Sequence, residues 1–155
     1  MACAFAECFE WFCSNRSELE SRWLGLRKKF LDSLEDVEHS FVLGTPDESL
    51  PNTLNLGFQG ISADSLLICL DLDGIAVSSG SACSSGAMEA SHVLLAMGYS
   101  HDQAKSSLRI SMGWNTSEED IEELSRQLIH HVNRLTPISG KSDSNIQIPE
   151  PVTEI

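Results

Sequence analysis

Basic residues are scarce in this chain. Ten lysines and arginines stand against 23 aspartates and glutamates, which gives a formal net charge of −13 over 155 residues. A surface of this sign repels phosphate backbones, so we expect no nucleic-acid partner and favour a basic protein or domain instead. Most of the acidic residues are expected to form an ordinary solvated surface.

Long apolar runs are also missing. No stretch approaches the roughly 20 apolar residues that a membrane-spanning helix needs, so no membrane partner is expected. The first residues are apolar, but they carry Glu7 and Glu10 and no basic region. They therefore make a poor signal peptide, and we expect a cytoplasmic location.

The five cysteines lack the spacing of a metal site. None forms a C-x-x-C pair, and the five-residue steps between Cys3, Cys8 and Cys13 do not suit zinc. The odd count and the apolar neighbours of Cys3, Cys8 and Cys69 predict reduced, buried thiols. Reduced thiols are typical of the cytosol or a similarly reducing compartment.

What the chain does contain is enough for one core, because 41% of its residues are hydrophobic. Apolar residues recur at helical spacing through residues 2–36, interrupted at 14–16, which predicts one long helix or two in line. Strands are predicted in HSFVLG, TLNLGF, IAVSS and SSLRISMG. Helices are predicted in SADSLLICLDLDG, AMEASHVLLAMG and TSEEDIEELSRQLIHHVNRL.

This order of elements predicts an α+β fold. We expect a small, mainly antiparallel sheet with helices against one face and a long N-terminal helix. Residues 1–136 are predicted to form one domain. Residues 137–155 are polar and contain prolines, which is typical of a disordered tail.

Cys83 is the first candidate for chemistry. It lies in VSSGSACSSG, between Gly80 and Gly86 and among small residues. The thiolate is the reactive form of cysteine, and a nearby helix N-terminus favours it; the next helix is predicted to start near Ala87. The residue types alone fit a reactive thiol on a flexible loop and a buried, inert thiol equally well.

Arg109 is the second candidate. It alternates with Leu108 and Ile110 in a predicted strand, so its side chain should point away from the core, to a side where a ligand can lie. Arginine binds carboxylates through two parallel hydrogen bonds. The pattern alone also fits an exposed or salt-bridged arginine without a ligand.

Two other possibilities are weak. The Gly/Ser run contains neither G-x-x-x-x-G-K-[ST] nor G-x-G-x-x-G, so it gives little support for a phosphate site. The histidines lie at positions 39, 92, 101, 130 and 131. They complete no metal site, and we interpret all five as structural or surface residues.

Three stretches together resemble a known family. They are LPNTLNLGF, LDLDGIAVSSGSACSSGAMEASHVLLAMG and SSLRISMGWNTSEEDIEEL. In this order they are similar to the C-terminal part, the small domain, of cysteine desulfurases. These enzymes belong to the class V aminotransferases, which are fold-type I pyridoxal-phosphate enzymes. The resemblance covers roughly Ala4 to Leu135.

The resemblance implies pyridoxal phosphate as cofactor and L-cysteine as substrate. Cys83 matches the cysteine that takes the sulfur of the cysteine–pyridoxal adduct and becomes a persulfide. Arg109 matches the arginine that holds the α-carboxylate of the substrate. Alanine is then the second product, and the sulfur passes to an acceptor protein such as an iron–sulfur assembly scaffold.

The sequence departs from the family in its lysines. Lys28, Lys29, Lys105 and Lys141 are its four lysines, and none follows a histidine as in the Ser-x-His-Lys motif of the family. The resemblance therefore implies no cofactor-binding residue here, no aldimine on this chain alone, and a separate cofactor-binding large domain as partner. We expect a fragment or split gene product that is inactive alone.

Two alternatives stay open beside a desulfurase. The chain is then either a non-catalytic module that carries a persulfide on Cys83 or binds a partner, or a folded scaffold without chemistry. In the family, the helix that matches residues 2–36 packs on both domains. For this reason Trp11, Phe12 and Trp23 are expected to lack part of their cover.

Overall fold

The structure is a computed structural model that describes residues 2–45, 48–79 and 90–136. Cys83 and the predicted tail of residues 137–155 lie outside these ranges. The elements in chain order are α1 (Ala2–Ser33), β1 (Ser40–Leu43), β2 (Thr53–Phe58), α2 (Ala63–Leu72), β3 (Ser78–Ser79), α3 (His92–Ala96), α4 (His101–Lys105), β4 (Ser107–Ser111) and α5 (Glu118–Leu135).

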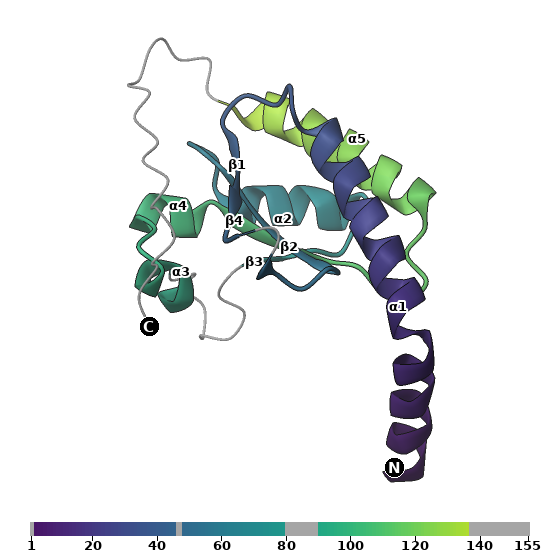
Figure 1. The fold of residues 1–155 in the computed structure, drawn as a ribbon. Helices are drawn as coiled ribbons and strands as arrows, with labels where there is room; N and C mark the ends of the chain where they lie inside the picture. The colour runs from purple at the N-terminus through teal and green to yellow at the C-terminus, as the bar shows by residue number, and fades with distance from the viewer. Residues whose placement is uncertain (1, 46–47, 80–89, 137–155) are drawn as a thin grey trace.

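The strands form one sheet in the order β1-β2-β4-β3, in which all neighbours are antiparallel. β4 comes late in the sequence but lies between β2 and β3, so it joins two parts of the chain that are far apart in sequence (Figure 1). The predicted α+β class, with an antiparallel sheet and a long N-terminal helix, is confirmed.

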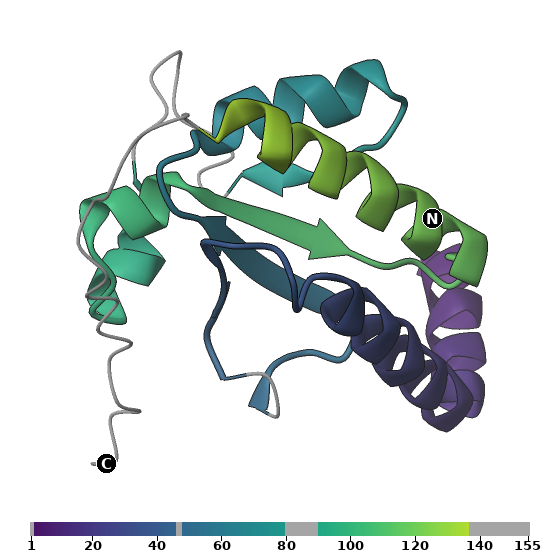
Figure 2. The ribbon, with the colours of Figure 1, turned by 90° about the horizontal axis from the view of Figure 1, so that it is seen from above.

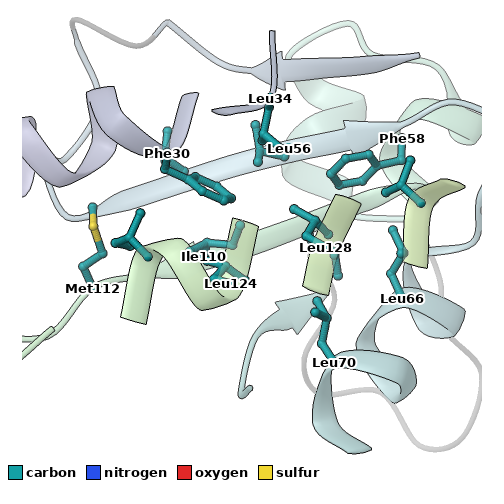
Figure 3. Packing of buried hydrophobic residues seen from close by; sticks show 14 of the residues in the cluster. Phe30, Leu34, Leu56, Phe58, Leu66, Leu70, Ile110, Met112, Leu124 and Leu128 are labelled. Carbon is teal, nitrogen blue, oxygen red and sulfur yellow. The ribbon is translucent and has the colours of Figure 1, made fainter. Parts of the chain in front are cut away.

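One face of the sheet carries the main core. Side chains alternate along a strand, and every second residue of β2 and β4 is buried on this face. α1, α2 and α5 supply the residues that pack against them (Figures 2 and 3). The buried set includes Phe30, Leu54, Leu56, Phe58, Leu66, Leu70, Leu108, Ile110 and Leu128.

The opposite face is only partly covered. Phe41 and Leu43 of β1 point to it and pack with Leu94 of α3 and Ala104 of α4 in a small second cluster. Helices cover the main-core face, as predicted, and two short helices also cover part of the opposite face. β1 carries apolar residues on both faces, and the short helices α3 and α4 bury those that point away from the main core.

α1 has two halves with different surroundings. In its second half Trp23, Leu26 and Phe30 are buried in the main core. Its first half projects beyond the domain (Figure 1), and there Phe5 is 74% exposed and Phe9 58%. Among the helices in the described ranges, none is both long enough and apolar enough to cross a bilayer.

The predicted interruption at residues 14–16 does not break α1. Ser14 Oγ donates a hydrogen bond to the Glu10 carbonyl at 2.9 Å, and Asn15 Nδ2 donates one to the Trp11 carbonyl at 2.7 Å. Side chains that bond the carbonyl one turn earlier tend to bend helices. The axis of α1 changes direction between its two halves in Figure 1.

Reciprocal capping boxes mark the starts of α4 and α5. Ser117 accepts a hydrogen bond from Asp120 N, and the Asp120 carboxylate accepts one from Ser117 N, a reciprocal capping box at the predicted start of α5. Ser100 and Gln103 form a second capping box at α4, a helix that the sequence reasoning missed. The pattern S-x-x-Q was the available signal for it.

The helix predicted for AMEASHVLLAMG begins later than expected. Ser91 is the N-cap of α3, its side chain accepts a hydrogen bond from Leu94 N, and the helix spans only His92–Ala96. The prediction of a start near Ala87 falls outside the described residues, but Ala90 and Ser91 are not helical. A serine that caps a helix favours a start directly after itself, which explains the shorter helix.

Candidate functional site

A row of four residues crosses the partly covered face of the sheet. In the strand register Leu43 lies opposite Asn55, Asn55 opposite Arg109, and Arg109 opposite Ser78. Residues that lie opposite each other point to the same face. The row therefore brings together side chains from all four strands, with Arg109 flanked by a polar residue on each side.

Arg109 is exposed, as its place between two buried residues predicts. Its Nη2 donates a hydrogen bond to Ser78 Oγ at 3.3 Å. Within the described residues it forms no ion pair with a carboxylate. A guanidinium has five N–H donors, so most of those of Arg109 remain available to a ligand.

The row opens into a cleft of about 410 Å³. Its walls come from the end of β1, the segment that follows β1, and α3. Gly44, at the end of β1, is held by a 2.8 Å hydrogen bond from its N–H to the Tyr99 hydroxyl. The lining residues are Leu43, Gly44, Thr45, Glu48, Ser49, Asn55, Ser91, Val93, Leu94, Met97 and Arg109. The lining includes one anion, Glu48, so a small carboxylate suits the side of the cleft where Arg109 lies.

Cys83, the predicted nucleophile, lies outside the described residues. The first described helix after it, α3, begins at His92, and the suggested activation by a helix N-terminus stays a prediction. The joint role of Cys83 and Arg109 stays a prediction.

The other cysteines differ from expectation. Cys3, Cys8 and Cys13 are exposed and Cys69 is half-buried, so the prediction of buried thiols at positions 3, 8 and 69 is wrong. The physical reason is the projecting half of α1, whose apolar neighbours are themselves uncovered. All four are free thiols.

An apolar cleft of about 810 Å³ lies beside the projecting half of α1. Trp11 of α1 meets Trp114 edge to face, with ring centroids 6.2 Å apart, and both are largely exposed. Trp23 is buried instead and donates a hydrogen bond to the Gly113 carbonyl at 3.0 Å. The expected lack of cover thus holds for Trp11 and Phe12 and not for Trp23.

His131, which the sequence analysis interpreted as a structural or surface residue, is buried. Its Nε2 lies 2.6 Å from Asp73 Oδ2, which ties α5 to the end of α2. Its place seven residues after Leu124 on the apolar stripe was the available signal for burial. Within the described ranges, no group of three or more His, Cys, Asp or Glu residues is arranged to hold a metal ion.

A family model described as aminotransferase class-V matches residues 1–124. The chain belongs to the class-V aminotransferase family. It is similar to cysteine desulfurase IscS 1 of Archaeoglobus fulgidus, with 34% identity over 135 residues, which is 87% of this chain and 35% of that protein. It is also similar to cysteine desulfurase NifS of Azotobacter vinelandii, with 40% identity over 115 residues, 74% of this chain and 29% of that protein.

Solved structures agree with this family. A NifS-like protein superposes with a TM-score of 0.73 and 27% identity over 84% of this chain and 32% of that chain. The NifS-like protein of Rickettsia africae superposes with a TM-score of 0.66 and 29% identity over 78% of this chain and 31% of that chain. The chain thus spans about a third of the length of these class-V relatives.

Class-V aminotransferases use pyridoxal phosphate, but the described lysines do not fit its attachment. None lines the Arg109 cleft. Lys29 bonds Glu118 at 2.8 Å and Glu122 at 2.6 Å, and these hydrogen bonds hold the pKa of its ammonium above the usual range. The hydrogen bond to Asp32 raises the pKa of Lys28 in the same way. A Schiff base needs a neutral amine, so these two residues are poor candidates.

Proposed function

We propose that this chain supplies the substrate-carboxylate anchor and the sulfur-accepting cysteine of a cysteine desulfurase. The observation that carries the proposal is Arg109, which forms no ion pair within the described residues and lies between Asn55 and Ser78 beside an open cleft. Its match to the family's arginine, and the cysteine desulfurases among the relatives, support L-cysteine as the ligand.

In the proposed reaction, Arg109 holds the α-carboxylate of L-cysteine and Cys83 receives its sulfur. A bond forms between the Cys83 sulfur and the substrate sulfur, and the carbon–sulfur bond of the substrate breaks. The electron pair of that bond remains with the carbon skeleton, which takes up the proton given up by the Cys83 thiol. L-cysteine and a thiol thus become alanine and a persulfide, and atoms and electrons balance without another reactant.

The cofactor part of the site is proposed to lie on a different segment. Neither described lysine on α1 has a free amine, and Lys105 of α4 lies outside the cleft of Arg109. The apolar cleft and the uncovered aromatic residues of the first half of α1 offer the contact surface for such a segment. The persulfide then passes to an acceptor protein, for which an iron–sulfur scaffold is the proposed class.

Lys28 and Lys29 are bonded to carboxylates, and no lysine lines the Arg109 cleft, which also favours a second candidate function. A module that only carries a persulfide needs Cys83 but neither a cofactor lysine nor a bound substrate. This alternative predicts sulfur transfer to Cys83 from an external donor, such as inorganic polysulfide, and no gain from a cofactor-binding segment.

The test incubates the purified chain with pyridoxal phosphate and L-cysteine, with and without the cofactor-binding segment of a cysteine desulfurase. Alanine is quantified, and the persulfide is located by mass spectrometry. We expect alanine and a Cys83 persulfide only when the segment is present, and neither product in Cys83→Ser. The matched control is Cys69→Ser, which removes a half-buried thiol and should leave both products unchanged.

Each other outcome decides against a specific part of the proposal. Turnover by the chain alone would show that the cofactor site is not on another segment. A persulfide from polysulfide, without alanine under any condition, would favour the carrier. Equal amounts of persulfide on Cys83 and Cys69 would contradict a special role for Cys83 in either function.

A further inference from the structure

Asn55 is placed beside Arg109 by the register of the sheet. The two residues are directly opposite each other on β2 and β4, and both line the same cleft. Side chains at opposite positions of an antiparallel pair have Cβ atoms about 5 Å apart. The Asn55 amide and the Arg109 guanidinium therefore reach into the same small volume.

The Asn55 side chain makes no hydrogen bond that ties it to the rest of the described fold. It is half-buried, and within the described residues no hydrogen bond uses its amide, whereas nearby Asn52 donates one to the Met112 carbonyl at 3.3 Å. Asn55 lines the cleft, so the donors of its amide are available to a ligand there. The cleft is the space into which its donor opens.

Ser78 fixes the other side of Arg109. The bond from Arg109 Nη2 to Ser78 Oγ draws one end of the guanidinium toward β3. The remaining donors are then left for the side of Asn55 and the cleft. The carboxylate of Glu48 also lines the cleft, so a ligand carboxylate is repelled from that wall and directed to the row of Asn55 and Arg109.

We propose that Asn55 is the second donor of the carboxylate site: its amide N–H binds one oxygen of a ligand α-carboxylate while Arg109 binds the other. Ser78 is a positioning residue, which acts through Arg109. This inference deepens the proposed function, on which it rests, and assigns to β2 a specificity for free amino acids that carry an unmodified α-carboxylate.

The test titrates the full chain with reduced L-cysteine and, separately, with cysteamine, which has the same thiol and amine but no carboxylate. Backbone amide shifts in NMR spectra report binding. Wild type is expected to prefer L-cysteine. Asn55→Ala should weaken L-cysteine binding about tenfold, the usual effect of losing one hydrogen bond to a charged group.

Asn55→Asp is the sharper variant, because it keeps the shape of the side chain and places a negative charge beside the ligand carboxylate. It should weaken L-cysteine binding more than Asn55→Ala does and leave cysteamine binding no weaker. Thr53→Ala is the matched control. It lies on the same strand and face, two residues from Asn55 and outside the cleft, and should bind as wild type does.

Ser78→Ala should weaken L-cysteine binding less than Asn55→Ala, and Ser78→Thr should restore it, because the hydroxyl returns. Unchanged L-cysteine binding in both Asn55 variants, with loss in Arg109→Ala, would overturn the inference and leave the proposed anchor standing. A wild-type chain without preference for L-cysteine over cysteamine would overturn both. Unfolding midpoints, measured for every variant, identify losses that come from unfolding.

Discussion

The two faces of the sheet are built from neighbouring residues and do different things. On one face Leu54, Leu56, Leu108 and Ile110 are buried under α1, α2 and α5. On the other, the residues between them include Asn55 and Arg109, which line an open cleft. Because side chains alternate along a strand, two consecutive residues of β2 or β4 lie on opposite faces, one in the core and the next on the face with the cleft.

This comparison shows how a small domain carries a site with little effect on its stability. The core face is apolar and closed, so it determines whether the chain folds. The open face carries polar side chains whose position is fixed by the same strands. Variants of the two faces should therefore separate stability from binding.

The largest expected effect is on the core face. Leu108→Ala removes a fully buried side chain and should lower the free energy of unfolding by about 2–5 kcal/mol. Arg109→Ala, the next residue, should change it by no more than about 0.5 kcal/mol because its side chain is exposed. Urea unfolding of both variants measures the difference. Similar losses in the two would contradict the division between faces.

A smaller effect on stability is expected on the second face, at the part that α3 and α4 cover. Gly57 of β2 lies opposite Phe41 of β1, and a Cβ at this position would overlap the Phe41 ring. Gly57→Ala should therefore lower the free energy of unfolding by about 1–3 kcal/mol, the range for overpacked sites.

Gly25→Ala is the control for this glycine substitution. Gly25 lies within α1, and a Cβ there meets nothing within 4 Å. Alanine should stabilise the helix at this position by about 0.5–1 kcal/mol. Opposite signs at positions 57 and 25 are the expected result, and destabilisation at both would show that Phe41 is not the cause.

The smallest effect concerns acid pH and α5, which covers the core face. Hydrogen bonds from Arg126 and then Gln127 lower the pKa of Glu123 below its ordinary 4.5. A carboxyl with a lowered folded-state pKa contributes stability above its ordinary value and loses it as the pH falls through the lowered one. Glu123→Gln should therefore flatten the acid limb of a plot of stability against pH, below about 4.5. An unchanged acid limb would contradict this role.

Much of the core face could be predicted from the sequence. The alternation in TLNLGF and SSLRISMG and the helical spacing in residues 2–36 are local patterns, and Leu54, Leu108 and Phe30, which lie in them, are core residues. The same alternation predicted that Arg109 points outward. Local patterns sufficed because each of these residues is buried or exposed according to its own element.

The arrangement of the open face could not be predicted in the same way. Asn55 and Arg109 are 54 positions apart in sequence, and only the pairing of β2 with β4 sets them side by side. The cover of this face by α3 and α4 also depends on contacts with β1 that no local pattern reveals. Cys3 and Cys8 of α1 were misjudged because apolar neighbours predict burial only where another element covers them.

We propose that Arg109 holds the carboxylate of L-cysteine while the sulfur of this substrate passes to Cys83. The most direct measurement locates persulfide by mass spectrometry in wild type and Arg109→Ala, each combined with the cofactor-binding segment of a cysteine desulfurase. L-cysteine and inorganic polysulfide are supplied in separate reactions. We predict that Arg109→Ala loses the Cys83 persulfide from L-cysteine and keeps the one from polysulfide. Equal persulfide from L-cysteine in both proteins would contradict the account.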